Sequence, residues 1–321
     1  GDRIVAHACL YFISTELDSF AQGMLKGMIS RVIAMWKNFL ILHSVECGTP
    51  VALGNTLSFH DGADKAGALT RIVGETERIA RELGAGVVLF RDFYDGELGF
   101  YDRLGGLGYK RIHNLPAPHL TVRWARFDDY LKSMRSAYRH KVLSRMETFR
   151  KAGGSLEALA EFSAVSADLG RLWRNAYDHA REYRREILKP DFFENMHRHL
   201  GDRSSVLLAR INGKPAGFSL LLHDDDTLIW MFCGLDYDCN EDGAVYFNML
   251  YRIVDLAITG GFKAVDLGIT TVIPKLDIGA DVVQQHMYMK HLNPLLGKVV
   301  PALFEMMNPR KPFAVRQVFK R

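Results

Sequence analysis

The sequence contains two places where side chains of types that transfer protons occur in or beside apolar segments. Asp266 lies near the end of an expected strand, where a carboxylate either accepts a proton or caps a neighbouring loop. Residues 285–292 are also expected to form a strand. Alternation gives that strand one polar face, which carries His286, Tyr288 and Lys290. An imidazole or a phenol there could protonate a leaving oxygen, or the face could simply contact water.

A cluster of basic residues is a third chemical feature. Between residues 132 and 151 seven basic residues oppose a single acid, although the net charge of the whole chain is only +4. A basic helix of this kind suits phosphate-bearing partners such as RNA or a nucleotide, and it can also be a solvated surface. The sequence therefore indicates, without deciding, a partner that carries phosphate.

Composition and motifs exclude several classes of protein. The chain has 321 residues, 48% hydrophobic and 24% charged, which is typical of a globular protein with two domains. No apolar run is long enough to span a membrane. The four cysteines form no Cys-x-x-Cys pair, which favours a reduced, cytoplasmic protein. No metal site, serine-nucleophile motif or P-loop is visible, and we expect neither a tightly bound cofactor nor DNA as a partner.

The order of expected elements is similar in the two halves. In each half a strand leads through a glycine-containing loop to a helix, a short strand and further strands, over 39–124 and 227–292. A helix is also expected over 15–38 and a long one over 127–151. The sequence therefore predicts a first domain at residues 1–125 and a second at 126–321.

The second half contains segments that carry a specific resemblance. These are Ala209-Arg-Ile-Asn-Gly-Lys-Pro-Ala-Gly217, the expected helix 244–259, Gly261-Phe-Lys-Ala-Val-Asp-Leu-Gly268 and Lys275-Leu-Asp-Ile-Gly279. They resemble the C-terminal domain of the Fem-type aminoacyltransferases, a branch of the GNAT superfamily of N-acyltransferases. The first half is similar to the latter part of another GNAT domain.

This resemblance implies an α/β (α+β) fold with two tandem GNAT-like domains, each a mixed, mostly antiparallel sheet flanked by helices. The first domain would be a degenerate copy and the second would carry the active site. In that domain two neighbouring strands, 227–235 and 262–267, would splay apart and leave backbone N–H groups free to hold an acyl carbonyl and its oxyanion. The amine would attack directly, without an enzyme nucleophile.

The same resemblance gives candidate roles to residues near this splay. Asp266 would take the proton of the amine, and Lys275 would face the transferred carbonyl or an RNA terminus. Tyr288 or His286 would protonate the leaving oxygen. Trp230 and Phe232, expected on one face of their strand, could line the donor or belong to the core. The remaining candidates for donor binding are Cys233, Tyr246, Asn248 and Lys290.

The identity of the donor depends on the loop before the helix 244–259. Acyltransferases that use coenzyme A typically have a glycine-rich motif there, because backbone amides at a helix N-terminus hold the pyrophosphate. Here the loop carries Asp236, Asp238, Glu241 and Asp242, which would repel that group. The Fem-type enzymes lack the motif and take their amino acid from aminoacyl-tRNA. The expected RNA-binding residues are Lys132, Arg135, Arg139, Lys141, Arg145, Arg174, Arg181 and Arg185.

The sequence therefore predicts an N-acyltransferase that forms an amide on a small-molecule or peptide amine, with aminoacyl-tRNA as the donor. Two alternatives remain open. One is an acyltransferase that binds acyl-coenzyme A in an unusual way. The other is a non-catalytic module that binds RNA or a peptide.

Overall fold

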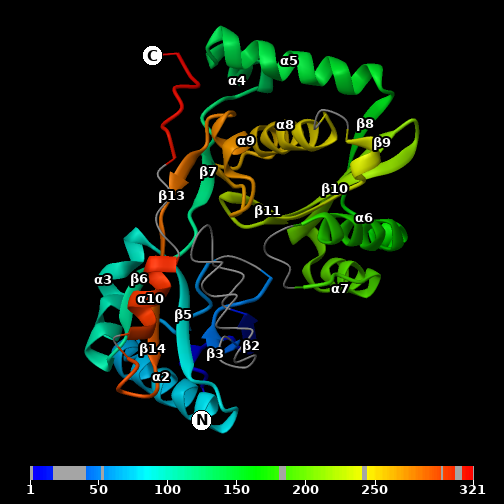
Figure 1. The fold of residues 1–321 in the computed structure, drawn as a ribbon. Helices are drawn as coiled ribbons and strands as arrows, with labels where there is room; N and C mark the ends of the chain where they lie inside the picture. Colours follow the sequence, from blue (N-terminus) through cyan, green and yellow to red (C-terminus); the bar gives the residue numbers. More distant parts are fainter. Residues whose placement is uncertain are drawn as a thin grey trace, which may run out of the picture. The chain divides into compact units, whose positions relative to one another are not determined.

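The computed structural model describes residues 3–16, 41–51, 54–180, 186–240, 244–297, 299–307 and 313–320. It contains two compact units, each built from two stretches of the chain (Figure 1). Unit 1 comprises Gly1–Pro116 and Gln284–Pro312, and unit 2 comprises Ala117–Val283 and Phe313–Arg321. The single boundary expected at residue 125 therefore does not describe these units, because each half of the sequence contributes a segment to both. The helix expected over 15–38 falls almost entirely outside the described residues.

Unit 1 is built on a five-stranded sheet with the order β2-β3-β5-β14-β6. Only β3 and β5 are parallel, and the helix α2 connects them. Helix α2 begins where the Asp64 side chain accepts a hydrogen bond from the Gly67 N–H, and its apolar positions face the sheet. The strands are β2 (Leu10–Glu16), β3 (Ile41–Cys47), β5 (Val87–Tyr94), β6 (Lys110–His113) and β14 (Gln285–His291), with the separate pair β1 (Ala6–His7) and β4 (Ser58–Phe59). The helices are α2 (Lys65–Glu82), α3 (Leu98–Tyr101) and α10 (Val299–Met307), with the 3₁₀ turns η2 (Asp95–Glu97) and η3 (Asp102–Leu107).

Unit 2 is built on a seven-stranded sheet with the order β13-β7-β12-β11-β10-β9-β8. Again one pair is parallel, β11 with β12, and the helix α8 connects its two strands. Its strands are β7 (Ala117–Thr121), β8 (Gly154–Leu159), β9 (Ser204–Ile211), β10 (Lys214–His223), β11 (Thr227–Leu235), β12 (Ala264–Asp266) and β13 (Asp281–Val283). Its helices are α4 (Phe127–Ser133), α5 (Ser136–Lys151), α6 (Ser166–His179), α7 (Pro190–Leu200), α8 (Ala244–Thr259) and α9 (Val272–Leu276).

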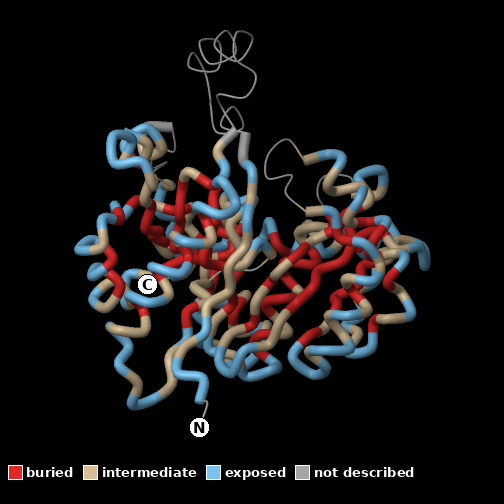
Figure 2. The backbone as a smooth tube through the Cα atoms, turned by 90° about the horizontal axis from the view of Figure 1, so that it is seen from below, coloured by how far each residue is buried: buried red, intermediate tan, exposed pale blue. Residues whose placement is uncertain are grey.

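Helices cover both faces of the unit 2 sheet (Figure 1). The helices α4, α5 and α8 lie on one face, where Tyr130, Val142 and Met249 share a core cluster with β-strand residues. The helices α6 and α7 lie on the opposite face, where α6 packs on β10 and β11. Buried segments run along the strands of both units (Figure 2). The expected fold class, two mixed and mostly antiparallel sheets flanked by helices, is confirmed.

The two halves of the chain exchange one strand each. After β6 the chain continues into β7, which lies between β12 and β13 of unit 2. After β13 it continues into β14, which lies between β5 and β6 of unit 1. Residues 119–124 are expected in the first domain and residues 285–292 in the second, but they lie in unit 2 and unit 1 respectively, so both predictions were wrong. Each of these strands lies between two antiparallel neighbours in its sheet, and the spacing of residues along a strand does not reveal which sheet it joins.

The helix expected over 127–151 is broken into α4 and α5. Met134 has an extended backbone, with φ −70° and ψ 147°, and forms a bridge with Phe319. The flanking backbone N–H of Arg135 donates to the Val318 carbonyl at 2.9 Å. The C-terminal segment therefore takes hydrogen bonds that a continuous helix would have used internally.

Candidate active site

In unit 2 the strand β11 is paired along only part of one side. It pairs with β10 from Leu228 to Leu235, but with β12 only at Thr227, Leu228 and Ile229. The last of these pairs is Ile229 with Asp266, where β12 ends. Within the described residues, β11 beyond Ile229 therefore has no strand partner on its β12 side. This is the geometry expected for strands that splay apart, and it leaves a backbone edge available to a bound carbonyl.

Unit 1 has no such unpaired edge within the described residues. Its equivalent strand, β3, ends at Cys47, which is also the last residue paired with β5. The next side chain on β5, Arg91, donates from Nη1 to the Glu46 carboxylate at 2.7 Å and to the Tyr11 hydroxyl at 2.6 Å. The position that is open in unit 2 is therefore occupied by an ion pair in unit 1.

A β-bulge gives the two aromatic candidates on β11 different surroundings. Leu221 pairs with Trp230 while the adjacent Leu220 pairs with Phe232, so Met231 is an extra residue on β11. Trp230 consequently belongs to the core on the α8 side, whereas Phe232 packs against the rings of Trp173 and Phe192 from α6 and α7. The expectation that Trp230 and Phe232 share one face was wrong, because the bulge interrupts the alternation.

Lys275 is a buried cation beside Trp230. Its side chain is 3% exposed, and its Nζ donates to the Gly268 carbonyl at 3.1 Å and to the Thr270 carbonyl. Nζ also lies 5.7 Å from the centroid of the Trp230 ring. Burial lowers the pKa of Lys275 to about 8, and the carboxylate of Asp266 opposes part of that shift. Lys275 therefore lies next to the start of the unpaired edge.

Tyr246 and Cys233 complete the surroundings of Trp230. The ring of Tyr246 lies 5.5 Å from that of Trp230. Its buried hydroxyl has no hydrogen-bond partner of good geometry among the described residues, although Thr271 is near enough to oppose the rise of its pKa caused by burial. Burial raises the pKa of Cys233 to about 12, so this residue is a neutral thiol. Cys233 is also close enough to Lys275 and Tyr246 to influence their pKa values, so these candidates for donor binding lie near one another.

Asn248 has a structural role. Its Nδ2 donates to the Ala244 carbonyl at 2.7 Å and to the Arg145 carbonyl at 3.0 Å, which ties α8 to α5. Because this amide group is 4% exposed and bonded on both sides, it does not face the unpaired edge of β11 as a free donor.

Asp266 is positioned by the loop that follows it. It is 5% exposed, and its Oδ1 accepts a hydrogen bond from the Gly268 N–H at 2.8 Å. Its Oδ2 lies 3.4 Å from Nε2 of His119, a residue of β7 that the sequence analysis did not single out. No signal in the sequence marked His119, because its segment was assigned to the other domain. Asp266 therefore caps its loop and also contacts an imidazole.

The three polar candidates on β14 lie in unit 1. The Tyr288 hydroxyl donates to Asp102 at 2.8 Å, and Nε2 of His286 lies 2.7 Å from Asp95. Lys290 donates to Glu77 at 2.8 Å. The expected alternation is confirmed, since Met287 and Met289 pack on the opposite face of the strand. The expectation that this strand borders the same splay as Asp266 and Lys275 was wrong, because β14 pairs with β5 and β6.

The expected basic surface is divided by the sheet. Lys132 is exposed, whereas Lys141 forms an ion pair with Asp277 at 2.6 Å. The Arg145 guanidinium lies 3.4 Å from the centroid of the Phe247 ring, so it packs on α8. Arg174 pairs with Asp178 on α6, which covers the opposite face of the sheet from α5 (Figure 1).

The remaining basic candidates differ in their contacts and in their exposure. Arg135 donates to the Gln317 side chain at 2.8 Å, and Arg139 is half-buried on α5. Arg181 and Arg185 lie outside the described residues. The structure therefore brings together Lys132, Arg135 and Arg139, and it does not join them to the arginine of α6.

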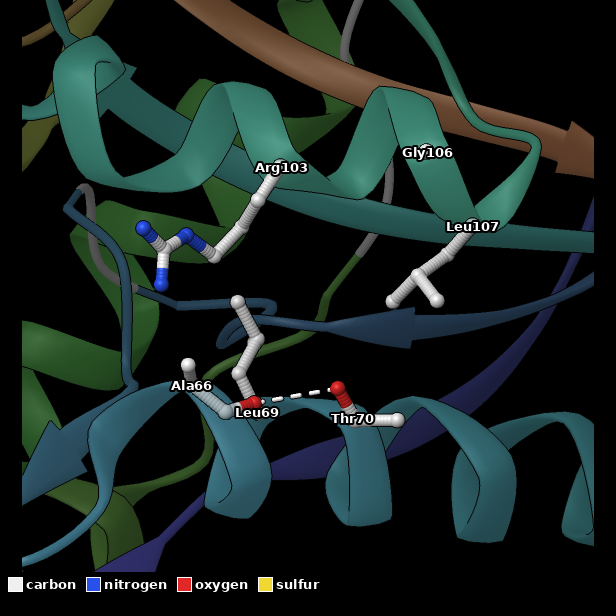
Figure 3. A pocket seen from close by; sticks show the side chains of 6 residues that line it. All are labelled: Ala66, Leu69, Thr70, Arg103, Gly106 and Leu107. Carbon is white, nitrogen blue, oxygen red and sulfur yellow. Dashed lines mark hydrogen bonds between the residues drawn. The ribbon is translucent and has the colours of Figure 1, made fainter.

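Unit 1 also contains an open hollow of about 380 Å³ between α2 and η3 (Figure 3). It is lined by Ala66, Leu69, Thr70, Arg103, Gly106 and Leu107. None of the predicted site residues lines it. In the described parts of the chain, no group of three His, Cys, Asp or Glu side chains could hold a metal ion. None of the described helices is long and apolar enough to cross a membrane.

Comparison with known proteins gives one family. Residues 135–273 match the model described as an acetyltransferase (GNAT) domain. A curated relative is "Putative 8-amino-7-oxononanoate synthase 2" of Mycobacterium tuberculosis, in the strains CDC 1551 and H37Rv. It is 25% identical over 313 residues, which are 96% of this chain and 41% of the relative. The chain therefore spans less than half the length of these relatives.

Solved structures with a similar fold include a domain of a putative lysylphosphatidylglycerol synthetase and FemX. The C-terminal domain of a putative lysylphosphatidylglycerol synthetase from Agrobacterium fabrum has a TM-score of 0.53 at 11% identity, covering 83% of this chain and 81% of that one. FemX has a TM-score of 0.52 at 12% identity, covering 91% of this chain and 100% of that one. At these identities the likeness concerns the fold.

Proposed function

We propose that this protein forms an amide by transferring an activated acyl group to an amine, because residues 135–273 match the model of an acetyltransferase (GNAT) domain and the fold is similar to that of FemX. One observation carries the proposal. The strand β11 has an unpaired edge beyond Ile229, and the buried residues Trp230 and Lys275 lie beside it together with Tyr246, which is partly buried.

The geometry supports direct aminolysis. Backbone N–H groups of an unpaired strand edge hold the carbonyl oxygen and stabilise the negative charge that develops on it, an effect worth about 2.7–4 kcal/mol for each donor. Lys275 adds a buried positive charge near this edge. Because its pKa is lowered to about 8, its ammonium releases a proton to a leaving oxygen or sulfur more readily than an ordinary lysine does. The aromatic rings of Trp230 and Tyr246 keep water from the bound acyl group.

We propose aminoacyl-tRNA as the donor. The N-terminal end of α8 follows a loop that carries Asp236 and Asp238, whose charges oppose a pyrophosphate. The exposed basic side chains near α5 favour RNA, and the resemblance to Fem-type enzymes points to the same donor. Acyl-coenzyme A remains the second candidate, since the matched family is one of acetyltransferases.

The relatives favour a small amine as the first acceptor to test. They are named as synthases of 8-amino-7-oxononanoate, a compound with an amino group next to a ketone. The amino group of such a compound could accept an acyl group on its nitrogen. A peptide amine is the alternative acceptor, and the two are compared directly in the assay below.

Mass spectrometry tests this function. The protein is incubated with charged tRNAs or with acyl-coenzyme A, in each case with 8-amino-7-oxononanoate or a short peptide as acceptor. We expect an amide product with the charged tRNAs. Product formation should be lost in Lys275→Met and kept in Lys263→Met, a matched change of an exposed lysine. Tight RNA binding without any amide product would instead indicate a non-catalytic binding module.

A binding assay tests the RNA surface separately. Lys132→Ala and Arg139→Ala are expected to weaken tRNA binding and to reduce its dependence on salt, because each removes a phosphate contact. Arg174→Ala, on the opposite face of the sheet, serves as the matched control. An equal loss of binding in all three variants would contradict the assignment of the surface to α4 and α5.

A further inference from the structure

A row of three residues crosses the unit 2 sheet where the splay begins. His119 on β7 is opposite Asp266 on β12, and Asp266 is opposite Ile229 on β11. Ile229 is the last residue of β11 that β12 pairs with. The imidazole and the carboxylate therefore stand beside the first unpaired residues of β11, with Nε2 of His119 3.4 Å from Oδ2 of Asp266.

This pair lies on the face of the sheet opposite to the donor residues. Leu120 and Val265, the neighbours of His119 and Asp266 in sequence, belong to the core on the α8 side. Because side chains alternate along a strand, His119 and Asp266 point away from α8. Trp230 belongs to the α8 side. An acyl donor and an acceptor amine could thus approach the same strand edge from opposite faces.

The surroundings of the pair fit a proton acceptor held by a fixed carboxylate. Oδ1 of Asp266 is held by the Gly268 N–H, which leaves Oδ2 directed at His119. The His119 side chain is 24% exposed and that of Asp266 is 8% exposed. Because Nε2 of His119 is buried beside Asp266, an acceptor can reach only the rest of the imidazole ring. On the other side of β7, Asp281 of β13 is paired with His119 and is exposed. Asp266 and Asp281 are therefore the residues paired with His119 on its two neighbouring strands.

We propose that His119 is the general base for the acceptor amine and that Asp266 is its positioning residue. This inference rests on the proposed acyl transfer. The acceptor ammonium gives one proton to the imidazole, directly or through one water, and its nitrogen then forms a bond to the acyl carbon. When the carbon–oxygen or carbon–sulfur bond to the carrier breaks, the leaving atom takes a proton from Lys275, and the second proton of the nitrogen replaces it there. The Asp266 carboxylate stabilises the imidazolium that forms.

The proposed base reaches the sheet of unit 2 only because the strand β7 is exchanged between the two halves of the chain. His119 comes from the first half of the sequence, and β7 carries it into the sheet of unit 2. A separate copy of the second half, without β7, would therefore contain Asp266 and Lys275 but lack the base.

Acceptors of different basicity test the proposal. The wild-type protein is compared with His119→Gln, using the donor that supports product formation, with an alkyl amine that is protonated at pH 7 and with hydroxylamine, which is neutral there. We expect His119→Gln to lower kcat with the alkyl amine by about 10²-fold or more, because a general base typically contributes that much. The rate with hydroxylamine should stay near the wild-type rate.

A rescue experiment separates proton transfer from a structural effect. Added imidazole should restore activity to His119→Ala. His199→Gln, a change of an exposed histidine on α7, is the matched control that should retain the wild-type rate.

The outcomes distinguish the two proposals. If the wild-type protein forms no amide with any donor, the proposed acyl transfer fails. If it forms amide and His119→Gln is equally active with both acceptors, or loses both equally with no imidazole rescue of His119→Ala, only the assignment of His119 is overturned. Circular dichroism of the variants identifies any that fail to fold, and His119→Asn then replaces His119→Gln.

Discussion

Lys275 is held in a buried position by main-chain carbonyl groups of its own loop. The Gly268 and Thr270 carbonyls accept hydrogen bonds from its ammonium group, and the Asp266 carboxylate is near enough to favour the charged form. Burial still outweighs these contacts, since the pKa falls from 10.5 to about 8. The charged form of Lys275 therefore costs folding free energy at neutral pH, which is typical of residues kept for chemistry.

This burial has a measurable effect on stability. Between pH 8 and 10.5 the unfolded chain binds more protons at Lys275 than the folded protein does, so the contribution of this residue to stability rises with pH. We expect a gain of up to about 3 kcal/mol across this range in wild type relative to Lys275→Met. Urea unfolding at several pH values measures it. Parallel stability curves for the two proteins would contradict the lowered pKa.

Gly268 holds the loop that carries these carbonyls. Its φ is +71°, and an added Cβ would lie 3.3 Å from the Trp230 carbonyl oxygen. Gly268→Ala should therefore lower stability by about 1 kcal/mol or more and reduce product formation. Gly99→Ala, where an added Cβ meets nothing within 4 Å, is the matched control. Thermal unfolding of both variants checks the difference.

At the scale of single elements, the sequence predicted most helices and strands and missed the irregularities within them. The bounds of β11 and α8 agree with the expectation because apolar periodicity and glycine signals mark them locally. The bulge at Met231 and the break at Met134 depend on contacts with other strands. Neither leaves a local signal, so the separation of Trp230 from Phe232 could not be predicted.

The C-terminal segment that breaks the helix should matter for stability. Val318 is 1% exposed, and its carbonyl accepts the Arg135 N–H at the start of α5. Val318→Ala should cost about 1–2 kcal/mol through the cavity it leaves. Val315→Ala, in the same segment but 91% exposed, should change nothing. Equal melting temperatures for the two variants would show that the segment does not pack as described.

At the scale of the whole molecule, the sequence predicted the fold class, whereas its candidate site residues are divided between the two units. Asp266, Lys275, Trp230 and Tyr246 come from one continuous stretch of unit 2, so family resemblance could place them together. His286, Tyr288 and Lys290 were assigned to that site because they follow it in sequence. The strand exchange places them in unit 1 and brings His119 into unit 2 instead.

The exchange also predicts how fragments behave. A fragment of residues 1–125 lacks β14, so β5 and β6 lose the strand between them. We expect this fragment to unfold without a cooperative transition, and a peptide spanning residues 284–297 to restore one. Differential scanning calorimetry measures both states. A peptide with the same composition in scrambled order is the control, and cooperative unfolding of the fragment alone would contradict the exchange.

Ribosomal synthesis gives the place of β14 a temporal consequence. The chain emerges from its N-terminal end, so everything through His113 is available long before Gln285 is made. During that interval the sheet of unit 1 lacks the strand between β5 and β6, whereas β7 is already available to unit 2. All strands of the unit 2 sheet are therefore made before β14 completes the sheet of unit 1, although the C-terminal segment of unit 2 is made last. We expect the nascent sheet of unit 1 to be the part that benefits from chaperones.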